Sequence, residues 1–429
     1  MKLYSTKDPK TLYSLKEAVL KGLPDDNGLF MPESIPRLPD SFFSDLGELS
    51  FAESSYKMAH TLIGDSIGAN DLKRIIDTAV NFPAPLIRLT DDVSVLELFH
   101  GPSLAFKDFG ARFMAQLMSF FNDSDQPLRI LVATSGDTGG AVAAGFLNTP
   151  GIEVVILYPS GKVSDLQEKQ LTTLGGNITA LEVAGTFDDC QHLVKRAFLD
   201  AELNKKHRLS SANSINIARL IPQMFYYVEA YKQLTDKSRP LVFSVPSGNF
   251  GNLTAGLFAK RMGLPVHQFI AATNENDIVP KYLNSGSYQP RPSVRTLSNA
   301  MDVGAPSNFA RMLDLYCSTW NIMKAEIKGY SYDDNTTKNG IAEVWEKHSY
   351  VIDPHGSVGY LALQEYYKKH PRANGVVLET AHPSKFLDTV EEVIGERVEI
   401  PERLAVLKDQ KKVAIQMSTK FEDFKEWLF

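Results

Sequence analysis

Cysteine is scarce in this chain of 429 residues, which has only Cys190 and Cys317. The two lie far apart in the sequence and form no Cys-x-x-Cys pair. This scarcity argues against a disulfide scaffold and a cysteine-based zinc site, and it fits a reducing compartment. None of the nine histidines occurs in an H-E-x-x-H spacing, so we expect no metal site.

An excess of basic charge is also lacking. The 45 Lys and Arg residues stand against 51 Asp and Glu residues, which gives a net charge of -6, so we expect no nucleic-acid partner. No apolar run is long enough to cross a bilayer, and the opening residues MKLYSTKDPK lack the apolar segment of a signal peptide. We expect a cytoplasmic protein with a small-molecule substrate, no membrane partner, and a monomeric or homodimeric state.

Several common catalytic motifs are missing as well. A Rossmann G-x-G-x-x-G motif and a Walker A loop do not occur at the strand ends, which argues against nicotinamide cofactors and ATP. The G-x-S-x-G elbow of serine hydrolases is absent too. The chemistry must therefore come from other residues.

The sequence does contain short apolar strands that alternate with helical segments. We expect these strands at 128–134, 153–159, 240–246, 266–274 and 374–380. Continuous apolar strands separated by helices indicate parallel sheets with helices on both faces. In such sheets, ligands bind in the crevice beyond the carboxyl ends of the strands.

The two ends of the chain have a different character. Residues 1 to about 90 resemble a separate cap, with helical patterns at 12–23 and 54–65. The stretch 81–89, NFPAPLIRL, has two prolines and is interpreted as a linker. The final segment 421–429, FEDFKEWLF, has apolar residues at helical spacing and is expected to dock on a surface groove.

The segment HGPSLAFKDFG, residues 100–110, places Lys107 directly after Leu104, Ala105 and Phe106. A lysine at the mouth of an apolar pocket loses hydration, its pKa falls, and it becomes a candidate nucleophile or Schiff-base former. The alternative is an ordinary helix start, with Asp108 in the first turn and Lys107 in solvent.

A glycine-rich turn, SGNFGNLTAG at 247–256, follows the expected strand 240–246. Gly248 and Gly251 allow a close backbone approach, and the first N–H groups of the following helix would point at one spot. This pattern predicts a phosphate site made of backbone. A tight strand-to-helix turn without a ligand is the alternative.

Two further strand ends carry polar groups. The loop TSGDTGGAV, 134–142, suits a carboxylate or a second phosphate, provided that Asp137 faces away or binds a hydroxyl or ammonium group. Thr380 ends the strand 374–380, where its hydroxyl could bond a heteroatom in the crevice. Both could instead be helix caps. The Ser- and Asn-rich segments 211–220 and 296–308 could be polar pocket walls or simple turns.

A lysine in an apolar setting, a phosphate site and a hydroxyl for a ring nitrogen together match the needs of pyridoxal 5'-phosphate. The chain also resembles the threonine synthase family, in its longer bacterial and fungal form. Seven motifs carry the resemblance, in chain order HGPSLAFKDFG, ATSGDTGGA, SANSINIARL, VPSGNFGNLTAG, TLSNAMDV, DPHGSVGY and TAHPSKF. The match runs to about residue 390, and nothing specific is recognised beyond it.

The resemblance implies an α/β protein of the fold-type II pyridoxal-phosphate class. Such a protein has two open, twisted, mostly parallel sheets with helices on both faces, here with a helical N-terminal cap. We expect a cap at 1–92, an α/β domain with the lysine and the substrate-side loop at 93–235, and an α/β domain with the phosphate site at 236–429.

The resemblance also implies roles for individual residues. Lys107 would hold the cofactor as a Schiff base and act as the catalytic base, and Thr380 would face the pyridine nitrogen. The expected ligands of the cofactor phosphate are Gly248, Asn249, Phe250, Gly251 and Asn252. The expected substrate-side residues are Ser103, Ser135, Gly136, Asp137, Thr138 and Asn213.

Two positions depart from the family pattern. An acidic residue is expected at 252, where Asn252 stands, but a backbone donor does not depend on the side chain. A small residue is expected at 379, where Glu379 stands. Because an inward carboxylate would repel an anionic substrate, we expect Glu379 to point out of the pocket.

The implied reaction converts O-phospho-L-homoserine and water to L-threonine and phosphate, through γ-elimination and β-addition of water. This is the last step of threonine biosynthesis. One alternative is a phospho-lyase of the same fold that yields 2-oxobutanoate. Another is a non-catalytic protein that binds the cofactor or an amino acid, although such a binder has no need of Lys107.

Overall fold

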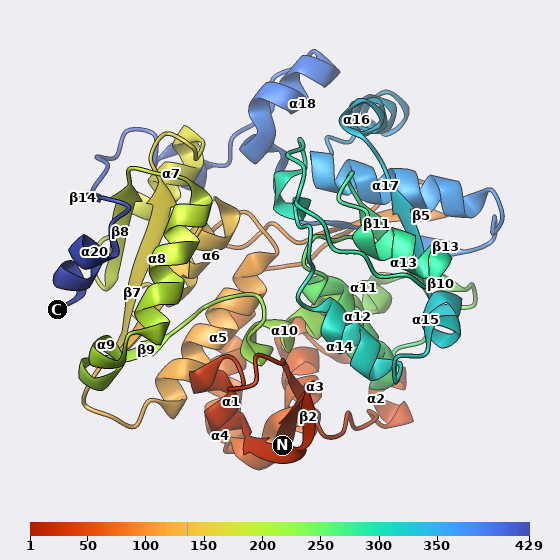
Figure 1. Ribbon diagram of the computed structural model, residues 1–429. Helices are drawn as coiled ribbons and strands as arrows, with labels where there is room; N and C mark the ends of the chain where they lie inside the picture. Colours follow the sequence, from red (N-terminus) through yellow and green to blue (C-terminus); the bar gives the residue numbers. More distant parts are fainter. Residues whose placement is uncertain (135) are drawn as a thin grey trace.

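The computed structural model describes residues 1–134 and 136–429. It contains two mostly parallel sheets with helices packed around them and a smaller antiparallel sheet in the N-terminal part (Figure 1). This is the open α/β architecture that the alternating strands and helices predict.

The larger sheet has six strands in the order β12-β11-β10-β13-β5-β4, and only the β4–β5 pair is antiparallel. Its strands are β4 (Leu86–Arg88), β5 (Val93–Glu97), β10 (Leu241–Pro246), β11 (Val266–Thr273), β12 (Ile327–Ser331) and β13 (Asn374–Glu379). β10 and β13 are adjacent, parallel and buried at every residue. The segments that follow Pro246 and Glu379 therefore begin side by side at one edge of the sheet.

The smaller parallel sheet has five strands in the order β14-β8-β7-β6-β9. Its strands are β6 (Leu128–Ala133), β7 (Ile152–Pro159), β8 (Ile178–Val183), β9 (Arg208–Ser210) and β14 (Ile415–Met417). The loop that begins at Thr134 leaves the carboxyl end of β6 near the middle of this sheet.

The five predicted strands are confirmed, and each end lies within one residue of its predicted position. The sequence analysis missed the shorter or more peripheral strands, such as β9 and β14, because three residues carry too little pattern to be recognised. The two sheets also exchange segments. β5 (93–97) pairs with β13, and β14 (415–417) pairs with β8, so neither sheet is built from one continuous stretch of chain.

The helices follow the strands in chain order. Residues 98–207 form α5 (Lys107–Phe121), α6 (Asp137–Phe146), α7 (Asp165–Thr172), α8 (Phe187–Leu199) and α9 (Ala201–Lys206). Later residues form α10 (Ile217–Leu220), α11 (Gln223–Gln233), α12 (Gly251–Arg261), α13 (Ile278–Ser285), α14 (Phe309–Leu315), α15 (Trp320–Glu326), α16 (Asp334–His348), α17 (Pro354–Tyr367), α18 (Leu387–Ile394), α19 (Glu402–Ala405) and α20 (Phe421–Leu428). Short 3₁₀ turns occur at 46–48, 64–66, 299–301 and 383–386. Within the described residues, no helix is both long and apolar enough to cross a membrane.

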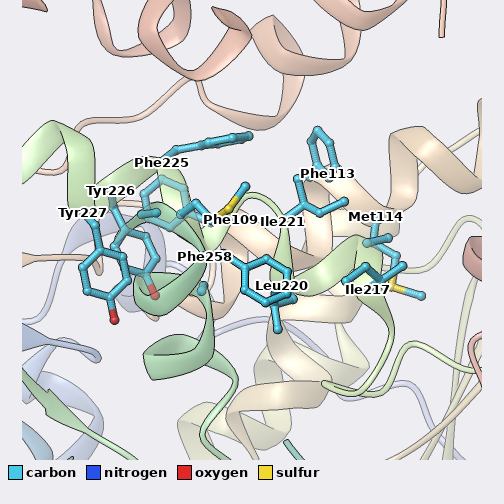
Figure 2. Packing of buried hydrophobic residues seen from close by; sticks show 14 of the residues in the cluster. Phe109, Phe113, Met114, Ile217, Leu220, Ile221, Phe225, Tyr226, Tyr227 and Phe258 are labelled. Atoms are coloured by element: carbon cyan, nitrogen blue, oxygen red, sulfur yellow. The ribbon is translucent and has the colours of Figure 1, made fainter. Parts of the chain in front are cut away.

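A buried aromatic cluster joins the helices that lead to the site. Figure 2 shows Phe109 of α5 among Phe225, Tyr226 and Tyr227 of α11, with Phe258 of α12 nearby. The Phe109 and Tyr226 rings are in edge-to-face contact at 5.5 Å between their centroids. Because interiors are close-packed, this cluster holds α5 and α12 at a fixed separation.

The N-terminal cap contains the predicted helices and one feature that the sequence analysis missed. Its helices are α1 (Leu15–Lys21), α2 (Asp40–Ser44), α3 (Phe51–Ile63) and α4 (Ala69–Ala79). Capping boxes at Ser14 and Ser50 begin α1 and α3. The missed feature is an antiparallel sheet in the order β2-β1-β3, made of β1 (Lys2–Ser5), β2 (Asp8–Ser14) and β3 (Phe30–Pro32).

The C-terminal helix docks as predicted. Phe421, Phe424 and Leu428 of α20 are buried in one cluster with Cys190 and Leu193 of α8. The helix thus covers apolar surface on the smaller parallel sheet's side of the molecule (Figure 1).

We expect Phe424→Ala to lower the free energy of unfolding by about 3 kcal/mol, because it removes a fully buried ring. Urea unfolding measures this loss. The control is Leu199→Ala on α8, where the side chain is 85% exposed and the change should stay within about 0.5 kcal/mol. Equal effects of the two substitutions would contradict the packing of α20.

Candidate active site

Lys107 is the first residue of α5, and the loop before it is joined to the end of β13. The N–H of Phe106 donates to the carbonyl of Thr380 at 2.9 Å, and Ala105 forms an antiparallel bridge with Ala381. These backbone bonds hold Lys107 beside Thr380, although the two residues are 273 positions apart in the sequence.

The Lys107 side chain is 15% exposed, and its Nζ lies 3.8 Å from Oδ2 of Asp137. Burial lowers the pKa of Lys107, Asp137 opposes this shift, and the nearby cations Lys385 and Arg219 add to it. Lys107 is therefore a desolvated amine and not the solvated lysine of the alternative interpretation.

Asp137, the first residue of α6, binds a second lysine more closely. Its Oδ1 accepts from Lys385 Nζ at 2.5 Å and from Gln167 Nε2 at 3.0 Å. Burial raises the pKa of Asp137, but Lys385 and Lys107 outweigh it and hold the pKa well below its usual range. Of the alternatives left open for Asp137, facing away or binding a hydroxyl or an ammonium group, the structure shows contact with ammonium groups, and the carboxylate lies between two lysines.

Lys385 was not singled out from the sequence, although it lies in the motif TAHPSKF. Its side chain is 1% exposed, and Nζ also donates to the carbonyl of Ser103 at 2.9 Å. One feature of the sequence could have pointed to Lys385. A lysine so close to the end of a buried strand is unusual unless its charge is paired.

The loop after β6 depends on its glycine. Gly136 has φ +153°, and a Cβ there would lie 2.9 Å from the amide of Gln167. The hydroxyl of Thr134 accepts from the N–H groups of Gly136 and Gly139 at 3.1 and 2.9 Å. Thr134 thus shapes the loop. Thr138 follows in the first turn of α6, and the predicted residue Ser135 lies outside the described residues.

Ser103 and Asp108 form a buried pair behind Lys107. The N–H of Ser103 donates to Oδ2 of Asp108 at 2.8 Å. Within the described part of the chain, the Ser103 hydroxyl and Oδ1 of Asp108 have no hydrogen-bond partner. Burial raises the pKa of Asp108 to about 6, against the effect of the Ser103 bonds. Asn213 is exposed and makes no hydrogen bond to another candidate residue among those described.

The glycine-rich turn runs from β10 into α12 through Phe250, which has a left-handed backbone with φ +60°. Among the described residues, no acceptor is found for the N–H groups of 248–252. The Asn252 side chain turns back to donate to the Pro246 carbonyl at 2.7 Å. The Asn252 side chain therefore points away from the N–H groups, and only its backbone is available to a ligand. Asparagine in place of the expected acidic residue at 252 leaves these N–H groups unchanged.

The Asn249 side chain hydrogen-bonds the glycine-rich turn to two other segments. Its Nδ2 donates to Ser214 Oγ at 2.8 Å, and its Oδ1 accepts from the N–H of Ser307 at 2.5 Å. The Ser- and Asn-rich segments 211–220 and 296–308 therefore form walls of the site, which was one of their two interpretations.

Glu379 is fully buried and does not point to solvent. Its Oε1 accepts from the N–H of Asp353 at 2.7 Å at the start of α17, where a side chain at Gly356 would overlap Oε2. Burial and the nearby Asp353 raise the pKa of Glu379 well above its usual range, which favours the protonated carboxyl. Thr380 directly follows the last residue of β13 and is buried as well.

A buried chain of bonds continues from Asp353. His355 Nδ1 donates to Asp353 Oδ2 at 2.6 Å, and His355 Nε2 accepts from the N–H of Ala300 at 3.2 Å. A Cβ on Gly248 would lie 2.7 Å from Cα of Met301, so this loop lies directly against the glycine-rich turn. The sequence analysis missed both Asp353 and His355.

These residues fit pyridoxal 5'-phosphate. The desolvated amine of Lys107 suits its aldehyde, the free N–H groups of 248–252 suit its phosphate, and Thr380 offers a hydroxyl for its ring nitrogen. The adjacency of β10 and β13 brings the last two together at one sheet edge.

The family profile described as pyridoxal-phosphate dependent enzyme matches residues 81–380. Profiles for the threonine synthase N terminus and C-terminal region match residues 2–80 and 356–427. The threonine synthase of Serratia marcescens is 46% identical over 100% of this chain and 99% of its own. The chain belongs to the threonine synthase family. It is therefore a pyridoxal-phosphate-dependent enzyme, and the family match extends well past residue 390, where the sequence analysis recognised nothing.

Solved structures agree with this family. The crystal structure of threonine synthase from Escherichia coli has a TM-score of 0.91 and 46% identity, covering 100% of this chain and 99% of that one. The pyridoxal-phosphate-bound threonine synthase from Brucella melitensis has a TM-score of 0.95 and 35% identity, covering 100% and 98%. The predicted fold-type II architecture is confirmed.

We expect Lys385→Met to raise the pKa of Lys107, because it removes a neighbouring cation and frees Asp137. Mass spectrometry of Lys107 acetylation in cofactor-free protein, measured across pH, should show the profile moving to higher pH. Lys412→Met, at a lysine bound to Glu168 and Glu182 in the C-terminal segment, serves as the control and should leave the profile in place. A shift to lower pH in Lys385→Met would refute the assigned charge effect.

We expect Glu379→Gln to gain stability relative to wild type as pH rises. The ordinary pKa of this carboxyl is 4.5 and the folded pKa is higher, so the unfolded chain loses the proton first and wild-type stability falls above that value. Urea unfolding near pH 4 and near pH 8 measures the difference. At Glu53, where bonds from Ser50 lower the pKa, Glu53→Gln should show the opposite trend. If the difference in unfolding free energy between Glu379→Gln and wild type did not change with pH, the raised pKa of the Glu379 carboxyl would be contradicted.

Proposed function

We propose that the chain converts O-phospho-L-homoserine and water to L-threonine and phosphate, the last step of threonine biosynthesis. The reaction is a γ-elimination followed by β-addition of water, which makes the protein a carbon-oxygen lyase. The observation that carries the proposal is the buried amine of Lys107 between Asp137 and the end of β13, in a chain related to threonine synthases along its whole length.

Lys107 is proposed as the group that moves protons. When bound, pyridoxal phosphate supplies an electron sink that stabilises negative charge on substrate carbons. Because burial lowers the pKa of Lys107, its amine loses its proton more readily than that of a solvated lysine, so it can take a proton from the substrate α-carbon. Once protonated, Nζ gains the attraction of the Asp137 carboxylate 3.8 Å away.

Lys385 keeps Asp137 ionised, so that Asp137 can stabilise the protonated form of Lys107. Because the Lys385–Asp137 contact is the shorter one, at 2.5 Å, Asp137 stays ionised whether or not Lys107 is charged. The substrate side is assigned to the backbone around Gly136 and Thr138, the free hydroxyl of Ser103, and, on the family resemblance, Ser135 and Asn213. The buried position of Lys107 also keeps bulk water from the reacting atoms.

We propose that Gly248, Asn249, Phe250, Gly251 and Asn252 bind the cofactor phosphate through their backbone and that Thr380 faces the pyridine nitrogen. We further propose that the enzyme works in the cytoplasm, as a monomer or homodimer, and without nucleic acid. The net charge of -6 and the two free cysteines support this setting.

The purified chain, supplied with pyridoxal phosphate and O-phospho-L-homoserine, should release threonine and phosphate in equal amounts. Lys107→Ala should cut turnover by at least about a thousandfold and abolish the visible absorbance of the lysine-bound cofactor, with circular dichroism unchanged. A Gly251→Asp variant should lose the cofactor, because it places a carboxylate at the phosphate site. Formation of 2-oxobutanoate and ammonia in place of threonine would refute the proposal.

A further inference from the structure

Asn308 lies directly before α14 and is fully buried over the glycine-rich turn. Its Oδ1 accepts from Nη1 of Arg311 at 2.7 Å, which fixes the orientation of the amide. Its Nδ2 has no hydrogen-bond partner in the described part of the chain, and it lies 3.4 Å from where a Cβ on Gly251 would be. A buried N–H without an acceptor is costly, so this geometry indicates a ligand that accepts from Nδ2.

Arg311 is a fully buried cation without an acidic partner among the described residues. Its guanidinium donates to the carbonyls of Phe30 and Ile215, at 3.1 and 2.7 Å, in addition to Asn308. Burial lowers its pKa to about 9, so it remains charged at neutral pH. Burying a charge is unfavourable unless an opposite charge lies nearby, and an anion in the adjacent turn would provide it.

The surroundings keep Asn308 against the turn. The N–H of the preceding residue, Ser307, donates to Asn249 Oδ1, so the segment is bonded to the turn itself. α12 is an 11-residue helix whose first N–H groups are free among the described residues, with the positive end of its dipole beside Gly251. A side chain larger than hydrogen at 251 would occupy the space between the amide and these N–H groups.

We propose that Asn308 donates its side-chain N–H to the phosphate of pyridoxal phosphate, and that Arg311 orients this amide and supplies positive charge behind it. The proposal rests on the proposed cofactor site, and it adds one side-chain donor to a site that otherwise consists of backbone. Arg311 is held in part by the carbonyl of Phe30, which belongs to the N-terminal cap. The proposal therefore makes the affinity for the cofactor depend on the cap.

The decisive experiment compares the binding of pyridoxal phosphate with that of pyridoxal, which lacks the phosphate. In the cofactor-free full-length chain, Asn308→Ala should raise the Kd for pyridoxal phosphate by about tenfold to a hundredfold, the effect of losing one hydrogen bond to a charged group. Its Kd for pyridoxal, which has no phosphate, should not change. Asn177→Ala is the matched control, since it removes side-chain bonds to the carbonyls of Phe146 at the end of α6 and Ile152 at the start of β7, next to the other parallel sheet. Its Kd for pyridoxal phosphate should equal that of wild type.

A second variant separates folding from binding. Asn308→Asp keeps the size of the side chain and the acceptor for Arg311, and it gives Arg311 a carboxylate partner. The cofactor-free variant should therefore melt at the same temperature as wild type or higher. Its affinity for pyridoxal phosphate should fall by at least about a hundredfold. Inorganic phosphate should raise the melting temperature of the wild-type apoprotein but not that of the variant.

Equal weakening of pyridoxal and pyridoxal phosphate in Asn308→Ala would overturn the proposal, because it would show a purely structural role. Wild-type affinity for pyridoxal phosphate in Asn308→Asp would overturn it as well. A wild-type chain that binds the cofactor with the predicted phosphate dependence but makes no threonine would refute the proposed reaction and leave the role of Asn308 intact.

Discussion

Desolvation of one amine is the constraint on which the rest of the site depends. Lys107 can act as a base only if its ammonium form is destabilised, and burial next to two other cations does this. A fully apolar setting would suppress charging altogether, which would prevent the amine from carrying a proton. Asp137 limits the shift, and its closer partner Lys385 prevents it from forming a tight ion pair with Lys107. The spacing of 3.8 against 2.5 Å is therefore a compromise between basicity and the capacity to hold a proton.

The folded protein contains buried charges and N–H groups near the site that lack partners of opposite charge or hydrogen-bond acceptors among the described residues. Arg219 and Arg311 are buried, and neither forms an ion pair with a carboxylate among the described residues. The N–H groups of 248–252 are also without acceptors there. Each of these features reduces the stability of the cofactor-free chain. An anion that binds the glycine-rich turn of the folded state would satisfy its N–H groups and offset the charge of Arg311. The cofactor is thus part of the energetics of the fold as well as of the chemistry.

The sequence predicts the residues that lie at the ends of recognisable strands. The glycine-rich turn and Thr380 belong to this group, because apolar strands and glycines leave a local pattern. Lys107 begins α5 and was recognised instead from the apolar residues directly before it, Leu104, Ala105 and Phe106. Lys385, Asn308 and Arg311 could not be assigned this way, since their partners lie far away in the chain: Lys385 reaches Ser103 across 282 positions, and Arg311 reaches Phe30 across 281. The peripheral strands β9 and β14 were missed for a related reason, as three residues acquire strand geometry only from a neighbour.

The smaller parallel sheet takes its edge strand β14 from the last fifteen residues, whereas its other strands lie between 128 and 210. During synthesis on the ribosome, β8 therefore presents an open edge until residues 415–417 have been made. Unpaired strand edges promote association between nascent chains. Residues 415–417 cover this edge, so a chain that stops before residue 415 would keep the β8 edge unpaired and prone to association.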